Sequence, residues 1–378
     1  MSDIYRILQL MVDHQASDAY LSGQSPILVK VNGVSHAAGQ QRLPEDAPRR
    51  MLQDLVPAER LVQFDQTGEL NTSVRVPAMG SFRISAMKQR GQCAVVLRYI
   101  PEEIPALEEL NLPAILARLV MRKRGLVLVV GATGSGKSTA LAAMIDHRNA
   151  LTSGHILTVE DPIEYTFVNQ LSIVNQREVG TDTASLSIAL HNAMRQAPDV
   201  IMIGEIRDRA TMTAALSYAQ SGHLCLATLH AATSYQALHR ILSFYPEEVR
   251  PLLQNDLASA LQAVISLRLL RTVDGTRLPA TEVMLNTRSV AELIEKGDFN
   301  GIRETLERGL TEDGQTFEQD IARLIASGRV SREEGLANAD SPSNLLWRLQ
   351  NTPPPSVGHP ALPAALHTRP GGLADLQP

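Results

Sequence analysis

The sequence is poor in cysteine, and this excludes two kinds of stabilising site. Its 378 residues contain only Cys93 and Cys225, which lie far apart and outside any metal-ligand spacing. Neither a disulfide framework nor a cysteine-based zinc site is therefore expected. Both cysteines lie in apolar, strand-like runs, which predicts buried free thiols in a reducing compartment.

Aromatic residues, positive charge and long apolar runs are also scarce. Aromatic residues make up 4% of the chain, and the formal net charge is −5, a composition that disfavours a nucleic-acid partner. No apolar run approaches membrane-spanning length. The N-terminus carries an early acid and no uninterrupted apolar core, unlike a signal peptide. A cytoplasmic protein is therefore expected.

The most informative stretch is a phosphate-binding loop. The unbroken apolar run 126–130 predicts a strand buried on both faces. It leads into a loop that fits the eight-position P-loop pattern and then into a helix from Lys137 to about Ala150. Glycines let backbone N–H groups turn toward a polyphosphate, and the helix N-terminus favours the same anion. The sequence therefore predicts binding of ATP with Mg²⁺.

Within this loop, Lys137 is expected to reach the β- and γ-phosphates, and the Ser138 hydroxyl to be a Mg²⁺ ligand. The residues predicted to hold the nucleotide are Gly131, Ala132, Thr133, Gly134, Ser135, Gly136, Lys137, Ser138 and Thr139.

Three further predicted strands end in polar residues. The first ends in the acidic segment 160–164, which contains Glu160 and Glu164, suited to holding Mg²⁺ or a water molecule. The next, 199–205, is Walker-B-like but has glycine where an aspartate usually stands, so Glu205 would polarise the attacking water or hold Mg²⁺ through a water. The third ends at His230, which is either structural or a donor to phosphate or a glutamate. The sequence does not decide which of Glu160 and Glu205 is the principal base.

The first hundred residues predict a small α+β domain dominated by an antiparallel sheet. An amphipathic opening helix, a strand at 27–31 closed by an Asn-Gly turn, a helix at 45–56 and strands at 70–76, 81–87 and 93–99 are expected. Arg83 should project from the face opposite Phe82, and Arg98 ends the next strand. Taken alone, each is more simply explained as a solvated arginine.

Four segments follow from these patterns. Residues 1–100 form the N-terminal domain, and the acidic, proline-punctuated segment 101–113 is a linker. Residues 114–350 form an α/β domain with a parallel-rich sheet, which includes a helix capped at 181–183 and a helical C-terminal part. Residues 351–378 hold seven of the 21 prolines and predict a disordered tail.

The motifs together resemble those of the type II/type IV secretion ATPases. The run 194–208 looks like their signature, and the P-loop, the acidic segment and the segment around His230 are similar to their other motifs, in the same order. The similarity extends from about residue 16 to about residue 270. Within this family, the length of the chain and its short N-terminal module resemble those of the pilus retraction motors of the PilT and PilU group.

This resemblance implies a homohexameric ring of PAS-like N-terminal domains and RecA-like motor domains. Such a ring would act in the cytoplasm at the inner-membrane base of a type IV pilus, beside a platform protein, and ATP hydrolysis would drive pilus retraction and twitching motility. Arg83 and Arg98 correspond to arginines that reach a nucleotide on a motor domain.

The C-terminal region, with segments 291–300 and 315–320, is more similar to PilU, which implies an accessory motor associated with a PilT-type partner. Two alternatives remain: a type II secretion or pilus-assembly ATPase, and a regulatory ring subunit that binds ATP and docks to a partner motor. Assembly and secretion motors usually carry a four-cysteine insertion, which this chain lacks.

Overall fold

The computed structural model describes residues 3–100, 103–309 and 313–351. These residues form two compact units that divide between residues 102 and 103. The start of the expected linker and nearly all of the expected proline-rich tail lie outside the described residues. None of the described helices is long and apolar enough to cross a membrane.

The first unit is built on a six-stranded antiparallel sheet with the order β3-β2-β1-β6-β5-β4. Its strands are β1 (Asp18–Ser22), β2 (Pro26–Val31), β3 (Val34–Arg42), β4 (Glu69–Val76), β5 (Gly80–Gln89) and β6 (Gln92–Ile100). Its helices are α1 (Asp3–Asp13), α2 (Ala47–Gln53) and α3 (Ala58–Thr67).

Local patterns predicted most of this unit. Phe82, Ile84 and Ala86 of β5 are buried, and Arg83 lies on the opposite face, as expected. The helix expected at 45–56 is wrong in extent, because α2 ends at Gln53 and Pro57 is the N-cap residue of the next helix, α3. The strands β1 and β3 and the helix α3 were not predicted.

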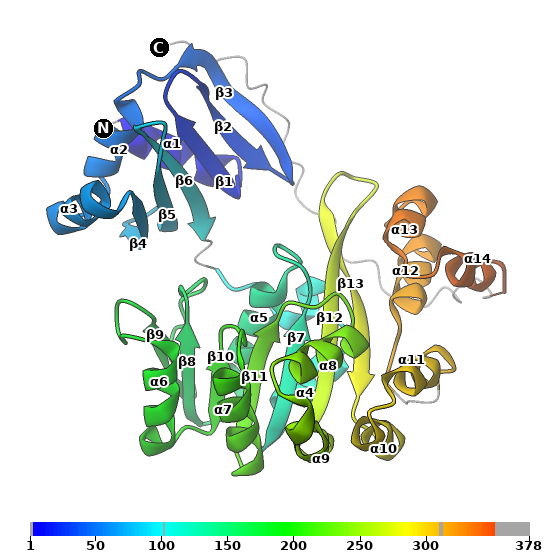
Figure 1. Cartoon of the computed structure of the whole chain (residues 1–378). Coiled ribbons are helices and arrows are strands. Elements are labelled where there is room, and N and C mark those ends of the chain that lie inside the picture. The colour runs from blue at the N-terminus through cyan, green and yellow to red at the C-terminus, as the bar shows by residue number, and fades with distance from the viewer. Residues whose placement is uncertain (1–2, 101–102, 310–312, 352–378) are drawn as a thin grey trace. The chain divides into compact units, whose positions relative to one another are not determined.

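The second unit contains a seven-stranded sheet with the order β13-β12-β7-β11-β10-β8-β9 (Figure 1). All neighbouring strands are parallel except β12 and β13. The strands are β7 (Gly125–Val130), β8 (Gly154–Glu160), β9 (Ser172–Glu178), β10 (Val200–Ile203), β11 (Leu224–Leu229), β12 (Leu261–Arg271) and β13 (Arg277–Leu285). The predicted fold class, a parallel-rich α/β domain preceded by a small α+β domain, is confirmed.

Helices cover both faces of this sheet. They are α4 (Ile115–Val120), α5 (Lys137–Leu151), α6 (Leu186–Ala193), α7 (Arg209–Gln220), α8 (Ser234–Ser243), α9 (Arg250–Ala260), α10 (Arg288–Lys296), α11 (Phe299–Glu307), α12 (Phe317–Ala326), α13 (Arg332–Asn338) and α14 (Pro342–Asn351). The helix expected to be capped at 181–183 begins later, because Ser185 is the residue whose side chain caps α6.

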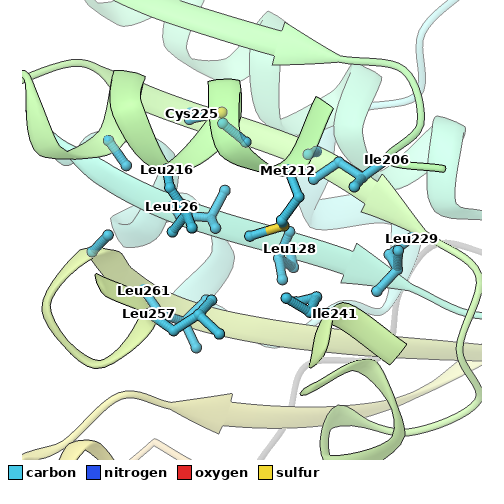
Figure 2. Packing of buried hydrophobic residues seen from close by; sticks show 14 of the residues in the cluster. Leu126, Leu128, Ile206, Met212, Leu216, Cys225, Leu229, Ile241, Leu257 and Leu261 are labelled. Atoms are coloured by element: carbon cyan, nitrogen blue, oxygen red, sulfur yellow. The ribbon is translucent and has the colours of Figure 1, made fainter. Parts of the chain in front are cut away.

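The strand β7 supplies the centre of two hydrophobic layers. Leu126 and Leu128 pack on one side with Met212 and Leu216 of α7 and Leu257 of α9, as Figure 2 shows. The alternate side chains of β7 pack on the other side with α4 and α5. This double burial fixes the end of β7, from which the phosphate-binding loop leaves.

Two smaller features complete the second unit. Leu107, in the segment expected as a linker, is buried in the layer that holds α4 and α5, and Leu110 and Leu112 pack against that layer. Near the C-terminus, α12 and α14 pack on the ends of β12 and β13 in a separate cluster. The two cysteines are buried and free, as predicted.

Candidate active site

The loop between β7 and α5 has a backbone that requires glycine. A Cβ atom on Gly131 would lie 2.3 Å from Ser135 Oγ and 2.5 Å from the Leu267 carbonyl oxygen. Gly134 and Gly136 have φ values of 77° and 93°, in the left-handed region that favours glycine. A Cβ atom on Gly134 would meet nothing within 4 Å, so the loop is open beside this residue. The loop thus has the tight backbone and the open side that a bound polyphosphate needs.

Lys137 lies in the first turn of α5 and is folded against this loop. Its Nζ donates to the carbonyl oxygens of Gly131 at 3.0 Å and Ala132 at 2.9 Å. Burial lowers the pKa of Lys137, and the charges of Glu205 and Glu164 oppose that shift. An ammonium group has three donors, so one donor remains for a phosphate oxygen after these two bonds.

Ser135 adds a hydroxyl group that is free to form a hydrogen bond. Its Oγ is buried and has no hydrogen-bond partner among the described residues. A buried hydroxyl without a partner is costly, and its place inside the loop fits a role as a donor to phosphate.

Glu160, at the end of β8, is the buried carboxyl of the site. It is 8% exposed, and its Oε1 accepts hydrogen bonds from Thr158 Oγ1 at 2.7 Å and Gln176 Nε2 at 3.2 Å. Burial raises the pKa of Glu160 to about 7, although these hydrogen bonds and one from the Glu164 backbone act to lower it. Near neutral pH the side chain can therefore exist in either protonation state.

Glu205 follows β10 and is held at both carboxylate oxygens. His230 Nε2 lies 3.2 Å from Oε1, and Arg207 Nε donates to Oε2 at 2.7 Å. The pairing with Glu205 raises the pKa of Arg207. Of the two partners expected for His230, a phosphate or a glutamate, the structure shows a glutamate, Glu205.

The glycine that precedes Glu205 has a steric reason. A Cβ atom on Gly204 would lie 3.2 Å from both Glu160 Cα and the Val159 carbonyl oxygen. A side chain there would crowd the backbone at the end of β8, which would have to shift by a few tenths of an ångström. Glycine at the position usually held by aspartate therefore lets the end of β10 lie close to the end of β8 without this crowding.

Tyr165 joins the segment after Glu164 to the nucleotide loop. Its hydroxyl lies 2.9 Å from Thr139 Oγ1, and its carbonyl oxygen accepts a hydrogen bond from Gln176 Nε2 at 2.7 Å. Because Gln176 also donates to Glu160, one side chain of β9 fixes both ends of this acidic segment.

The two candidate arginines of the first unit, Arg83 and Arg98, lie side by side on its sheet. Arg83 of β5 is paired with Arg98 of β6, and Arg98 is paired with Asp18 of β1. Arg98 Nε donates to Asp18 Oδ1 at 2.8 Å, and the Asp18 side chain is 6% exposed. Arg98 is therefore an ion-pair partner of a buried acid as well as a candidate nucleotide ligand.

Four contributors to the site were not identified from the sequence: Thr158, Tyr165, Gln176 and the contacts of Arg207. Thr158 interrupts an apolar run two residues before Glu160, a polar signal on the same side of the strand. Gln176 gave no such signal, because its role depends on the pairing of β9 with β8.

The residues present are compatible with Mg²⁺ held together with a nucleotide. The described part of the chain has no group of three or more histidine, cysteine or acidic residues that could hold a metal alone. Mg²⁺ in nucleotide sites usually takes one or two protein oxygens, with phosphates and waters completing its ligands. The Ser138 hydroxyl and the Glu160 carboxylate offer oxygens of this kind.

Comparison with known proteins identifies a family and two similar relatives. A family model described as type II/IV secretion system protein matches residues 59–304. The type IV pilus ATPase PilU of Pseudomonas aeruginosa is 44% identical over 341 residues, which are 90% of this chain and 89% of that protein. PilT of the same organism, a type IV pilus retraction ATPase, is 35% identical over 91% of this chain and 100% of its own length.

A solved structure supports the fold directly. The crystal structure of the pilus retraction motor PilT with bound ADP matches with a TM-score of 0.82 and 35% identity. The match covers 92% of this chain and 99% of that one. From the family model, the two relatives and this structure together, the chain belongs to the type II/IV secretion system protein family.

Proposed function

We propose that this chain is an ATPase that powers type IV pilus retraction, in the accessory role of PilU. The observation that carries this proposal is the 44% identity with PilU over nine-tenths of the chain. Two features of the second unit support it: the contact between Glu205 and His230, and the phosphate-binding loop whose backbone requires glycine.

The proposed roles follow the geometry of the site. Lys137 would neutralise the β- and γ-phosphates, and Ser138 and Glu160 would hold Mg²⁺, which supplies charge stabilisation when bound. Glu205 would orient and activate the attacking water, and His230 would hold the Glu205 carboxylate. Glu160, with a pKa of about 7, is the alternative base, and Glu164 would add to the negative field around Lys137.

The proposed assembly is a homohexamer with shared active sites. Arg83 and Arg98 of one subunit would reach a nucleotide bound to its neighbour, where guanidinium groups stabilise charge that develops on transferred phosphate. Turnover would then depend on the angle between units, which would couple hydrolysis to rigid-body motion. A PilT-type motor and an inner-membrane platform protein are the proposed partners, at the cytoplasmic base of the pilus.

Pilus retraction in living cells tests this function. A strain that lacks the protein would be complemented with the wild-type chain, Lys137→Ala or Arg288→Ala, an exposed arginine on α10 as control. We expect retraction to be restored by the wild type and Arg288→Ala only. Restoration by Lys137→Ala would favour the regulatory ring subunit, and a secretion defect with normal retraction would favour the secretion ATPase.

A further inference from the structure

Arg207 connects two strand ends in the site. Its Nε donates to Glu205 Oε2 at 2.7 Å, and its Nη1 lies 3.5 Å from Asp161 Oδ2. Glu205 follows β10 and Asp161 follows β8, the neighbouring parallel strand. One guanidinium group therefore contacts carboxylates from both sides of the site.

The backbone around Glu205 is already fixed. The Gly204 N–H donates to the Val159 carbonyl at 2.8 Å, and the Ile206 N–H donates to the Thr228 carbonyl at 2.9 Å. Ile206 is buried, so the side chains of Glu205 and Arg207 on either side of it are left to meet each other. What the backbone leaves undetermined is the direction of the Glu205 carboxylate.

That direction is determined by two contacts. His230 faces Oε1 and Arg207 holds Oε2. A planar guanidinium offers donors in fixed directions, whereas a lysine ammonium in the same place would act as a point charge. Charge-assisted hydrogen bonds of this kind are short and directional.

The other arm of Arg207 acts on the acidic segment. Asp161 is the first residue after Glu160, and its side chain is 58% exposed. The contact with Arg207 ties the beginning of segment 161–164 to the residue that carries the proposed base.

We infer that Arg207 is a positioning residue, which holds the Glu205 carboxylate and the Asp161 segment in register for ATP hydrolysis. This role rests on the proposed ATPase function and extends it. Arg207 touches neither the phosphate loop nor Lys137 in the described contacts, so its removal should slow turnover without weakening nucleotide binding.

Steady-state kinetics of the full-length chain test this role. Arg207→Ala should lower kcat about tenfold with KM within about twofold, because one charge-assisted hydrogen bond contributes on that scale. Methylguanidinium added at millimolar concentration should restore part of kcat, since the Arg207 side chain is 59% exposed, and methylammonium should not. Arg288→Ala, which removes an exposed arginine paired with Glu292 at 3.2 Å, should leave kcat unchanged.

Asp161→Asn separates the contact of Arg207 with Asp161 from its contact with Glu205. It should lower kcat less than Arg207→Ala, and it should cause no further fall in the Arg207→Ala background, because both changes break the same bridge. An unchanged kcat in Arg207→Ala, an equal rescue by methylammonium, or independent effects of the two substitutions would overturn the role.

Hydrogen exchange distinguishes this role from the proposed function. The backbone N–H groups of residues 161 and 163–167 should exchange several-fold faster in Arg207→Ala than in the wild type, whether or not the chain hydrolyses ATP. Absence of turnover in the wild type would refute the proposed ATPase. Unchanged exchange in this segment would refute the bridge.

Discussion

Arg83 and Arg98 are directly paired across the antiparallel ladder of β5 and β6. Like charges in such positions repel each other. Asp18 is paired with Arg98 from β1 and contacts its guanidinium at 2.8 Å, which offsets part of that repulsion. The sheet thus holds two guanidinium groups at directly paired positions of adjacent strands.

This arrangement gives Arg98 a structural role that can be measured. Arg98→Ala should lower the free energy of unfolding by about 1–3 kcal/mol, because the buried Asp18 carboxylate loses its charged partner. Asp18 would retain the Ser17 hydroxyl at 2.9 Å. Urea unfolding of the full-length chain measures the effect, and adding Asp18→Asn should recover most of the loss. A double variant as unstable as Arg98→Ala would contradict this explanation.

Arg83 is therefore the cleaner probe of a shared active site. Arg83→Ala and Lys137→Ala chains should each be nearly inactive alone, and a mixture should regain part of the ATPase activity. Mixed rings would contain some sites with both an intact loop and an intact arginine, and an arginine supplied in trans contributes about 10³-fold or more to turnover. Confirmed co-assembly without recovered activity would show that Arg83 acts within its own subunit or not at all.

Ser135→Ala should separate stability from binding. Because Ser135 Oγ is buried without a described partner, its removal should leave the free energy of unfolding unchanged or raise it by up to about 1 kcal/mol. Nucleotide affinity should fall roughly fivefold, the loss of about one hydrogen bond. Thr281→Val, which removes another buried hydroxyl without a described partner, should not change affinity. Equal affinities in Ser135→Ala and the wild type would exclude a phosphate contact.

Glu160 should make stability depend on pH in the absence of metal and nucleotide. Its pKa is 4.5 as a free group and about 7 in the folded chain, so the protonated form is favoured by folding. Its contribution is fully present below pH 4.5 and is lost as the pH rises through 7. The stability of Glu160→Gln relative to the wild type should therefore increase by about 2–3 kcal/mol from pH 5 to pH 8. A difference that does not change with pH would contradict the burial of this carboxyl.

Local patterns in the sequence were sufficient for much of the second unit. The apolar run of β7, the glycines of the loop and the acids at the ends of β8 and β10 are short-range signals, and each indicated an element or a candidate site residue. Gly204 shows the limit of such signals, since its position is crowded by the backbone of Val159 and Glu160 on a neighbouring strand. The sequence shows that glycine replaces the usual aspartate at position 204, but it does not show the steric reason.

Contacts between distant segments escaped prediction for the same reason. Asp18 and Arg98 are separated by 80 positions, and the strand β1 that carries Asp18 was itself not predicted. Helix α3 was missed because its apolar residues are sparse, with Phe64 alone fully buried. The bridge from Arg207 to Asp161 spans 46 positions and depends on the parallel pairing of β10 with β8.

The assignment of Glu205 as the water-activating residue is tested most directly by single-turnover hydrolysis. Wild type, Glu205→Gln and Glu160→Gln would be saturated with ATP and Mg²⁺, with binding measured on the same samples. We expect Glu205→Gln to bind ATP as the wild type does and to hydrolyse it about a hundredfold or more slowly, because a positioned general base contributes 10²–10⁴-fold. Glu160→Gln should also weaken the dependence on Mg²⁺. Hydrolysis at the wild-type rate by Glu205→Gln, or loss of its ATP binding while Glu160→Gln binds normally, would contradict the assignment.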